Sequence, residues 1–482
     1  MKKNMQQSDG LFFIVCLTLG ILAEESFFRG QIGISNIVFI VALYGVFFWR
    51  FYGFPFANQR LGYLVAICIW LLSISFYISD NMFFYVLNIV VVPVLVLFHF
   101  LLIARPKLLL WTSLSFVKYA FWRIIEAIRF DFRFSASHLK FFKGDNQKII
   151  FWKKVLIGII LSLPVLGIVL YLLSTADANF KQIVGNLPEW FHQVKPDTVF
   201  RFFVIIGYTF AFFGVLFVLG QKKMTVIEKN NSFSIPVDGV IALTVLVLMN
   251  AVYLLFTIVQ FQYFFGGILQ ESYTFAQYAR KGFFELLAVS IINLSLTVSI
   301  LLGVKQSDAL VKKWLQISLS LLILMSCVIL VSAFLRMYLY EKAYGFTFTR
   351  MLAHSFMIFL TVIFAYTLVK IWFEKLSLFH FYFISALLYY TGINVVDLDR
   401  LVVQQNLVRY EQTGNIDLQY LNHLSYTGVL GLIQLYEKNP DLPGLREILR
   451  ERKREIEWEN RTWQSANLKQ QEASAALKKL PN

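Results

Sequence analysis

The sequence predicts an all-α protein: a polytopic transmembrane helix bundle of about 11 spans, with a small helical C-terminal domain. Hydrophobic residues make up 58% of its 482 residues and charged residues only 15%, against about 25% charged in typical soluble domains. Apolar runs of about 20 residues, the length at which a helix crosses a bilayer, recur along the chain. Helical periodicity, rather than strand alternation, continues into the polar C-terminal part. We therefore expect lipid to surround most of the chain.

Eleven segments have the length and apolar character of spans: 10–28, 32–50, 61–79, 82–104, 155–174, 199–220, 237–262, 283–304, 314–336, 351–370 and 376–394. The first is the weakest, because Glu24 and Glu25 shorten its apolar core to 13 residues. Lys2 and Lys3 precede it, but no small-residue cleavage site follows, so we expect a retained anchor. A count of ten or twelve spans remains open.

The distribution of Lys and Arg among the loops predicts the orientation. The loop 105–154 holds eleven Lys and Arg against three acidic residues, and the loops at 50–60, 221–236 and 305–313 are also basic. The alternating loops are nearly neutral or acidic. We therefore expect a cytoplasmic N-terminus and, with eleven spans, an extracytoplasmic C-terminal domain. The net charge of +15 follows this topology, so nucleic acid is not an expected partner.

Four regions follow from these spans. They are an N-terminal four-helix membrane region (1–104), a basic cytoplasmic loop (105–154), a seven-helix membrane region (155–394) and an extramembrane helical C-terminal domain (395–482). In the basic loop, apolar residues recur at helical spacing over 114–130, with Lys, Arg and Glu between them. This pattern is typical of an amphipathic helix on an anionic leaflet, although it also suits the docking of a cytoplasmic partner.

The C-terminal domain holds twelve Lys and Arg and twelve Asp and Glu, so its own charge does not decide its side. Its periodicity predicts three helices. The first ends at a turn over 413–415, the second contains "DLQYLNHLS" (417–425), and the third runs from about Leu445 to Lys479 after "NPDLPG" (439–444).

The stretch "TFAQYARKGFFELL" (274–287) places charged residues where a span begins. Thr274 and Gln277 have capping-box spacing, which predicts a helix that starts outside the membrane. Arg280 and Lys281 would then lie at headgroup depth, with Glu285 one turn further in and four residues from Lys281. One interpretation is an interface anchor in which Lys281 neutralises Glu285. The other is an outward-facing polar cavity that also uses Arg336, Arg350, Gln260 and Gln262.

Signatures of catalysis and metal binding are missing from the sequence. It contains no Walker-type loop, His-Glu-x-x-His, Cys-x-x-Cys or Gly-x-Ser-x-Gly. Cys16, Cys68 and Cys327 lie far apart in apolar segments, as inert core thiols do. Asn88, His99 and Asn250 are single polar groups within spans and predict interhelical hydrogen bonds. No catalytic residue, metal ligand or cofactor is assigned, and an enzymatic role is not indicated.

Six motifs occur in order: "YFFGG" (263–267), "YARKGFFELL" (278–287), "AYGFTFTR" (343–350), "NVVDLDRLVVQQNLVRY" (394–410), "DLQYLNHLS" (417–425) and "WQSANLKQQEA" (463–473). Over roughly 235–475 the chain resembles a family of bacterial polytopic inner-membrane proteins known only as a domain of unknown function. The resemblance implies an integral membrane protein and supplies no activity. It departs at Gln277 and after Leu424-Ser425, where the family often has an acidic residue.

Residues within these motifs define a binding or structural polar cluster: Tyr278, Arg280, Lys281, Glu285, Arg336, Arg350, Asp399, Asn406 and Arg409, with Arg336 added by its position at the outer end of a span. Asp399, Asn406 and Arg409 share one helical face. This face is expected to pack the C-terminal domain onto the outer loops through Arg280 and Arg350.

Three functional classes fit the sequence. The preferred one is a non-enzymatic envelope sensor or interaction protein. The alternative is a transporter or channel with an outward-facing polar cavity, and a membrane enzyme acting on lipid or glycan comes third. Expected partners are the lipid bilayer and another membrane or envelope protein, in the bacterial cytoplasmic (inner) membrane.

Overall fold

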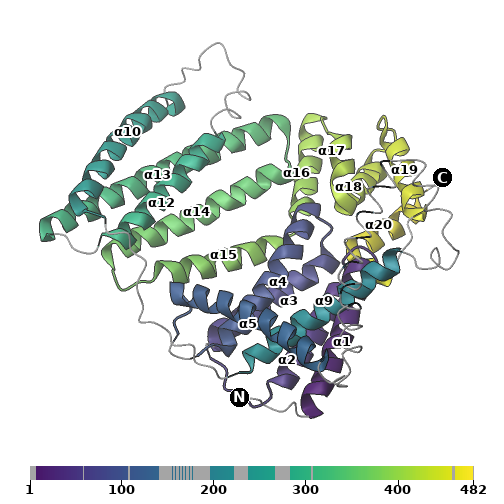
Figure 1. The fold of residues 1–482 in the computed structure, drawn as a ribbon. Coiled ribbons are helices and arrows are strands. Elements are labelled where there is room, and N and C mark those ends of the chain that lie inside the picture. The colour runs from purple at the N-terminus through teal and green to yellow at the C-terminus, as the bar shows by residue number, and fades with distance from the viewer. Residues whose placement is uncertain are drawn as a thin grey trace. The chain divides into compact units, whose positions relative to one another are not determined.

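The computed structural model describes residues 7–57, 59–106, 109–139, 196–221, 237–265, 283–304, 308–458 and 462–480, together with isolated positions between 155 and 176. Every regular element in these ranges is a helix (Figure 1). The predicted all-α class is confirmed.

Nine helices in the described part of the chain are long and apolar enough to cross a membrane. They are α1 (Gln7–Phe28), α3 (Gln59–Ile78), α4 (Met82–Ala104), α9 (Pro196–Leu219), α10 (Gly239–Phe265), α12 (Phe283–Gly303), α13 (Ala309–Tyr344), α14 (Phe348–Trp372) and α15 (Leu378–Val395). The apolar helix α2 (Ile34–Arg50) is shorter, with 17 residues. The predicted span at 155–174 lies almost wholly outside the described residues. The chain is therefore a polytopic helical membrane protein.

Contacts divide the chain into two compact units. Unit 1 comprises Met1–Gln31, Val41–Phe54 and Lys118–Lys223, and unit 2 comprises Ile32–Ile40, Pro55–Val117 and Met224–Asn482. The C-terminal helices therefore belong to the same unit as α3, α4, α10 and α12 to α15. The four regions expected from the sequence stay a prediction, because these units group residues by contact alone.

In unit 1, α1 packs antiparallel to α9. Gly20 lies so close to Thr209 that a Cβ atom would come within 2.4 Å of its hydroxyl oxygen. Glu24, which weakened the first predicted span, is only 1% exposed and lies 3.3 Å from Arg29 and 3.5 Å from Arg201. These guanidinium groups compensate its charge, so the carboxylate does not prevent α1 from serving as a span.

The basic loop contains the long helix α5 (Leu114–Leu139), which extends beyond the predicted 114–130. Its exposed residues include Phe121, Ile128 and Phe132, as expected of an amphipathic helix. Arg123, expected on the polar face, is instead buried and donates to the carbonyl oxygens of Val218 (3.3 Å) and Gln221 (3.0 Å). It thereby satisfies carbonyl groups left open at the end of α9. Contact of α5 with an anionic leaflet stays a prediction.

Polar side chains join the membrane helices of unit 2. Asn88 of α4 donates to Ser75 of α3 (3.1 Å) and to Asn394 of α15 (2.7 Å). Asn250 of α10 donates to the carbonyl oxygen of Ser318 in α13 (2.9 Å). The predicted interhelical hydrogen bonds of Asn88 and Asn250 are confirmed. The side chains of Asn88 and Asn250 therefore serve to hold neighbouring membrane helices together.

The C-terminal domain has more helices than the three predicted. It contains α16 (Leu398–Thr413), α17 (Leu418–His423), α18 (Ser425–Lys438), α19 (Leu445–Trp458), the short 3₁₀ helix η2 (Trp463–Ser465) and α20 (Leu468–Lys479), packed around their own apolar core. The predicted second helix is broken at Ser425, whose φ of 53° is left-handed. The predicted third helix is also broken, because Asn467 caps a new helix at α20.

Candidate functional site

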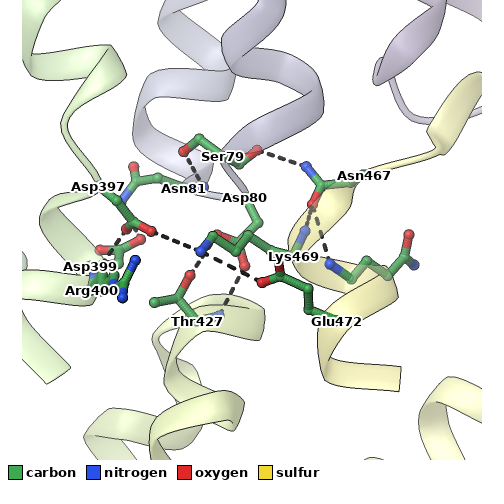
Figure 2. A network of polar contacts seen from close by, with 11 residues as sticks. Ser79, Asp80, Asn81, Asp397, Asp399, Arg400, Thr427, Asn467, Lys469 and Glu472 are labelled. Atoms are coloured by element: carbon green, nitrogen blue, oxygen red, sulfur yellow. Dashed lines mark hydrogen bonds and ion pairs between the residues drawn. The ribbon is translucent and has the colours of Figure 1, made fainter. Parts of the chain in front are cut away.

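The turn between α3 and α4 is hydrogen-bonded to the C-terminal domain. We call this network the polar clamp; it consists of Ser79, Asp80, Asn81, Asp397, Asp399, Thr427, Asn467 and Lys469 (Figure 2). The turn has only three residues, yet its side chains and carbonyl groups contact the first turns of α16, α18 and α20. The clamp therefore ties the ends of two membrane helices to three helices of the C-terminal domain.

Asp80 caps α18 from a distant part of the chain. The residue before α18, Leu424, has no side chain that can accept a hydrogen bond. Asp80 accepts instead from the backbone N–H of Thr427 (3.1 Å) and from its hydroxyl (3.2 Å), across 347 positions of sequence. A carboxylate at this place satisfies open amide groups and opposes the positive end of the helix dipole.

Asn81 and Asn467 each cap one helix and bind a second element. Asn81 accepts from the N–H groups of Phe83 and Phe84 at the start of α4 and donates to Asp399 at 2.8 Å. Asn467 caps α20 and donates to the carbonyl oxygens of Phe76 (3.2 Å) and Ser79 (2.8 Å) at the end of α3. In each of these two amides, therefore, the oxygen accepts from one helix start and the nitrogen donates to a second element.

An ion pair completes the clamp. Asp397 caps α16 by accepting from Arg400 N (2.9 Å) and lies 3.2 Å from Lys469 Nζ of α20. Lys469 is also 3.8 Å from Glu472. Asp399, by contrast, has no cation as a partner in the described part of the chain.

Asp399 is 3% exposed, and this burial raises its pKa to about 7. The charges of Asp80 and Asp397 raise it further, whereas the hydrogen bond from Asn81 opposes the increase. Burial also raises the pKa of Asp80. The charge of Asp80, a half-buried carboxyl group of the membrane turn, therefore acts on Asp399, a buried one of the C-terminal domain.

A second contact joins the C-terminal domain to α2. The backbone N–H groups of Gly33 and Ile34 donate to the carbonyl oxygens of Gln464 (2.9 Å) and Ala466 (3.2 Å). A Cβ atom on Gly33 would lie 2.4 Å from the Ala466 oxygen, so only glycine fits here. The open amides at the start of α2 are thereby satisfied by the segment around η2.

A third contact forms at the turn between α13 and α14, which carries the motif "AYGFTFTR". Asn406 of α16 accepts from Phe346 N (3.1 Å) and donates to Phe346 O (2.8 Å), while Arg409 donates to Ala343 O (3.0 Å). Tyr420 of α17 accepts from Phe348 N at 2.8 Å. The predicted face of α16 thus binds the backbone of this turn.

Replacing Gly345 with Ala should destabilise this turn. Gly345 has φ of 85°, and a Cβ atom would meet Asn406 Oδ1 at 2.9 Å. We expect a cost of about 1–3 kcal/mol, measured as a lower thermal unfolding temperature in detergent. Gly414 is the matched control, because it has φ of 70° but nothing within 4 Å of an added Cβ. Equal effects of Gly345→Ala and Gly414→Ala would show that the contact with Asn406 does not matter.

Of the remaining residues of the predicted polar cluster, Arg350 lies at the same turn between α13 and α14, whereas Arg336 and Glu285 lie elsewhere. Arg350 donates to Gly345 O and its guanidinium lies 4.2 Å from the centre of the Tyr340 ring, while Arg336 is buried within α13. Glu285 is exposed in the first turn of α12 rather than directed into the bundle. The predicted roles of Tyr278, Arg280 and Lys281, including the pairing of Lys281 with Glu285, lie outside the described residues.

Sequence reasoning missed a buried pair and most of the clamp. Glu341 at the end of α13 is 2% exposed and lies 2.9 Å from His354 Nε2 of α14. Their 13-residue separation spans a turn, so no single helix places them on one face. Asn467 did carry a local signal, because Asn is a preferred cap, whereas Leu424 indicated only that α18 needs a cap from elsewhere. Among the described residues, no three His, Cys, Asp or Glu side chains could together hold a metal ion.

These features define a class: a polytopic helical membrane protein whose C-terminal domain is fixed to membrane-helix ends by shared caps. The family model described as "Domain of unknown function (DUF4153)" matches residues 66–435, and the chain belongs to this family. The match starts well before residue 235, so it includes α4 and most of α3. It ends at residue 435, so it includes five of the six motifs and leaves out "WQSANLKQQEA" (463–473). No curated protein and no solved structure matches the chain.

Proposed function

We propose that this protein is a non-enzymatic envelope sensor or interaction protein of the bacterial inner membrane. The polar clamp is the observation that supports this function. Because caps of α4, α18 and α20 are shared between the membrane turn and the C-terminal domain, a force or ligand acting on that domain would reach the ends of α3 and α4 directly. The C-terminal domain would read the signal, and the membrane helices would transmit it.

The charges at the two ends of unit 2 support an extracytoplasmic C-terminal domain. Arg60 starts α3, Arg105 follows α4, and Lys312, Lys313, Lys370 and Lys375 lie at the corresponding ends of α13 to α15. All are at the opposite helix ends from the clamp. By the positive-inside rule this basic end faces the cytoplasm and the clamp faces the envelope.

Labelling of a single cysteine tests this orientation. Gln412, exposed near the end of α16, is replaced with Cys after Cys16, Cys68 and Cys327 have been changed to Ala. A membrane-impermeant maleimide should label Gln412→Cys on intact spheroplasts, and a cysteine at Lys375 should react only after lysis. The reverse pattern would exclude an envelope-facing domain.

Photo-crosslinking in cells tests the interaction role. A photoreactive amino acid at exposed positions of α16 and α19 should give a discrete product with another envelope protein. Asn467→Ala, which opens the clamp, should change the sites that crosslink when each product is normalised to the amount of protein. Absence of any product from both helices would contradict an interaction role.

The buried pair of Glu341 and His354 favours transport as the second candidate function. Ionisable residues buried within membrane helices frequently form proton or solute pathways. Their contact at 2.9 Å places an acid and an imidazole between α13 and α14. If the protein is a proton-coupled carrier, Glu341→Gln should abolish solute uptake in proteoliposomes while the thermal unfolding temperature is retained. Unchanged uptake would exclude this pair from the pathway.

A further inference from the structure

A cavity of about 780 Å³ lies at the basic end of unit 2, opposite the polar clamp along α3 and α15. Its walls are the starts of α3 and α15 and the segments before α3 and after α4. Ligand sites in proteins commonly measure about 300–1,000 Å³. We propose that this cavity binds the phosphate headgroup and upper acyl chain of one anionic phospholipid from the surrounding bilayer. The proposal is independent of the sensor function.

Most of the wall is apolar. Phe56, Leu61, Leu64, Trp111 and Ile384 contribute side chains to it. Trp111 is only 9% exposed and its ring centre lies 5.2 Å from that of His380 and 5.2 Å from that of Phe383. These packed rings form one side of the cavity, and an apolar surface of this kind binds a hydrocarbon chain rather than a small hydrated ion.

The polar part of the wall carries the positive charge of Arg60. Arg60 and His380 line the cavity with Gln59, and no carboxylate is among its lining residues. Within the described ranges Arg60 forms no hydrogen bond or ion pair, so its guanidinium is available for two parallel hydrogen bonds to a phosphate. The charge of the cavity therefore complements an anion.

The backbone adds to this charge. α3 and α15 both begin beside the cavity, with 20 and 18 residues, so the positive ends of two helix dipoles lie there. The Ser377 hydroxyl caps α15 by accepting one long hydrogen bond, from His380 N at 3.4 Å. Because serine is uncharged, it does not compensate the positive end of the α15 dipole. Two helix starts and a guanidinium around one apolar cavity fit a phosphate ester with an attached chain.

The position of the cavity identifies the source of the ligand. α3 and α15 are both long and apolar enough to cross the membrane, so the cavity at their ends lies at headgroup depth. The Lys and Arg residues of this end place it in the leaflet where anionic lipids gather. A phospholipid can enter sideways with its chain along Leu64 and Ile384, whereas a soluble phosphate would leave those walls uncovered.

Native mass spectrometry of the purified full-length protein tests the proposal. Phosphatidylglycerol and phosphatidylcholine with identical acyl chains are titrated in a neutral detergent. Wild type should bind phosphatidylglycerol about tenfold more tightly, and Arg60→Gln should remove that preference. The reason is that Arg60 attracts the net negative charge of phosphatidylglycerol, whereas the choline cation of phosphatidylcholine neutralises its phosphate. Lys313→Gln, the same change at an exposed residue of this end, should bind as wild type does. Equal binding of both lipids by wild type, or unchanged binding by Arg60→Gln, would overturn the proposal.

Two further measurements test the apolar part of the cavity and the source of the ligand. Ile384→Trp fills the apolar part and should lower phosphatidylglycerol binding about tenfold while the unfolding temperature in detergent is maintained; unaltered binding would place the lipid elsewhere. Inorganic phosphate at millimolar concentration should not displace the lipid. Displacement would identify a soluble anion as the ligand and overturn a lipid site.

Discussion

Asp399→Asn is expected to remove most of the pH dependence of the clamp's stability. Burial raises the pKa of Asp399 from 3.8 to about 7, so between these values the folded protein holds a proton that the unfolded chain has lost. The free energy of unfolding must then fall as the pH rises through this window. From pH 5.5 to pH 7 the loss is about 2 kcal/mol, at 1.36 kcal/mol per pKa unit.

The groups around Asp399 determine how the asparagine side chain of Asp399→Asn would behave. Asp80 and Asp397 repel the ionised form, and Lys469 is held by Asp397 at 3.2 Å rather than by Asp399. An amide oxygen at position 399 can still accept from Asn81 Nδ2, so the hydrogen bond at 2.8 Å is retained. Tyr420 also faces Asp399 and has a pKa raised by burial, so it stays neutral throughout the window.

Thermal unfolding in detergent at pH 5.5 and pH 8 measures this effect. Wild type should unfold at a lower temperature at pH 8, and Asp399→Asn should show little difference between the two conditions. Asp417→Asn is the control, because Asp417 is an exposed cap of α17 and its amide caps equally well. If the unfolding temperature of Asp399→Asn falls between pH 5.5 and pH 8 as much as that of wild type, another group must titrate.

The outcome bears on the proposed function. If the clamp tightens when Asp399 binds a proton, acidification of the envelope side would fix the C-terminal domain more firmly to α3 and α4. The clamp would then add a pH response to whatever signal the domain reads. This consequence depends on the outward orientation, which the cysteine labelling decides separately.

Local patterns in the sequence were sufficient to predict the helices. Apolar length placed ten of the eleven predicted spans on described helices, because a membrane helix must satisfy its own backbone hydrogen bonds. Helical offsets also placed Asp399, Asn406 and Arg409 on one face of α16, and that face contacts the turns at Asn81 and Phe346. Both predictions depend only on positions within one helix.

The partners of that face could not be found in the same way. Asp80 and Thr427 are 347 positions apart, and nothing near either residue specifies the other. The continuous helix predicted over 445–479 failed for a different reason. An apolar stripe does run along α19 through Leu445, Ile448, Leu449 and Ile456, but a stripe does not show where a helix ends. The break between α19 and α20 depends on Asn467 and on contacts with α2 and α3 that periodicity does not reveal.

Asn467→Ala should have the largest effect of any single change in the clamp. The substitution removes the cap of α20, worth about 1 kcal/mol. It also leaves the carbonyl oxygens of Phe76 and Ser79 without a donor, at about 1 kcal/mol or more each. We therefore expect a loss of about 2–4 kcal/mol, seen as a lower unfolding temperature and faster amide hydrogen exchange in α20.

Asn439→Ala provides the comparison, because Asn439 is exposed and its side chain makes one hydrogen bond, to Tyr410 at 3.0 Å. This variant should lose less than about 1 kcal/mol. The decisive measurement is a double-mutant cycle between Asn467→Ala and Asp80→Asn. If the membrane turn holds α18 and α20 as one assembly, the two losses will not add, since releasing either helix already loosens the other. Strictly additive losses would mean that the two helices bind the turn independently, and a signal on α20 would then have no route to α18 through it.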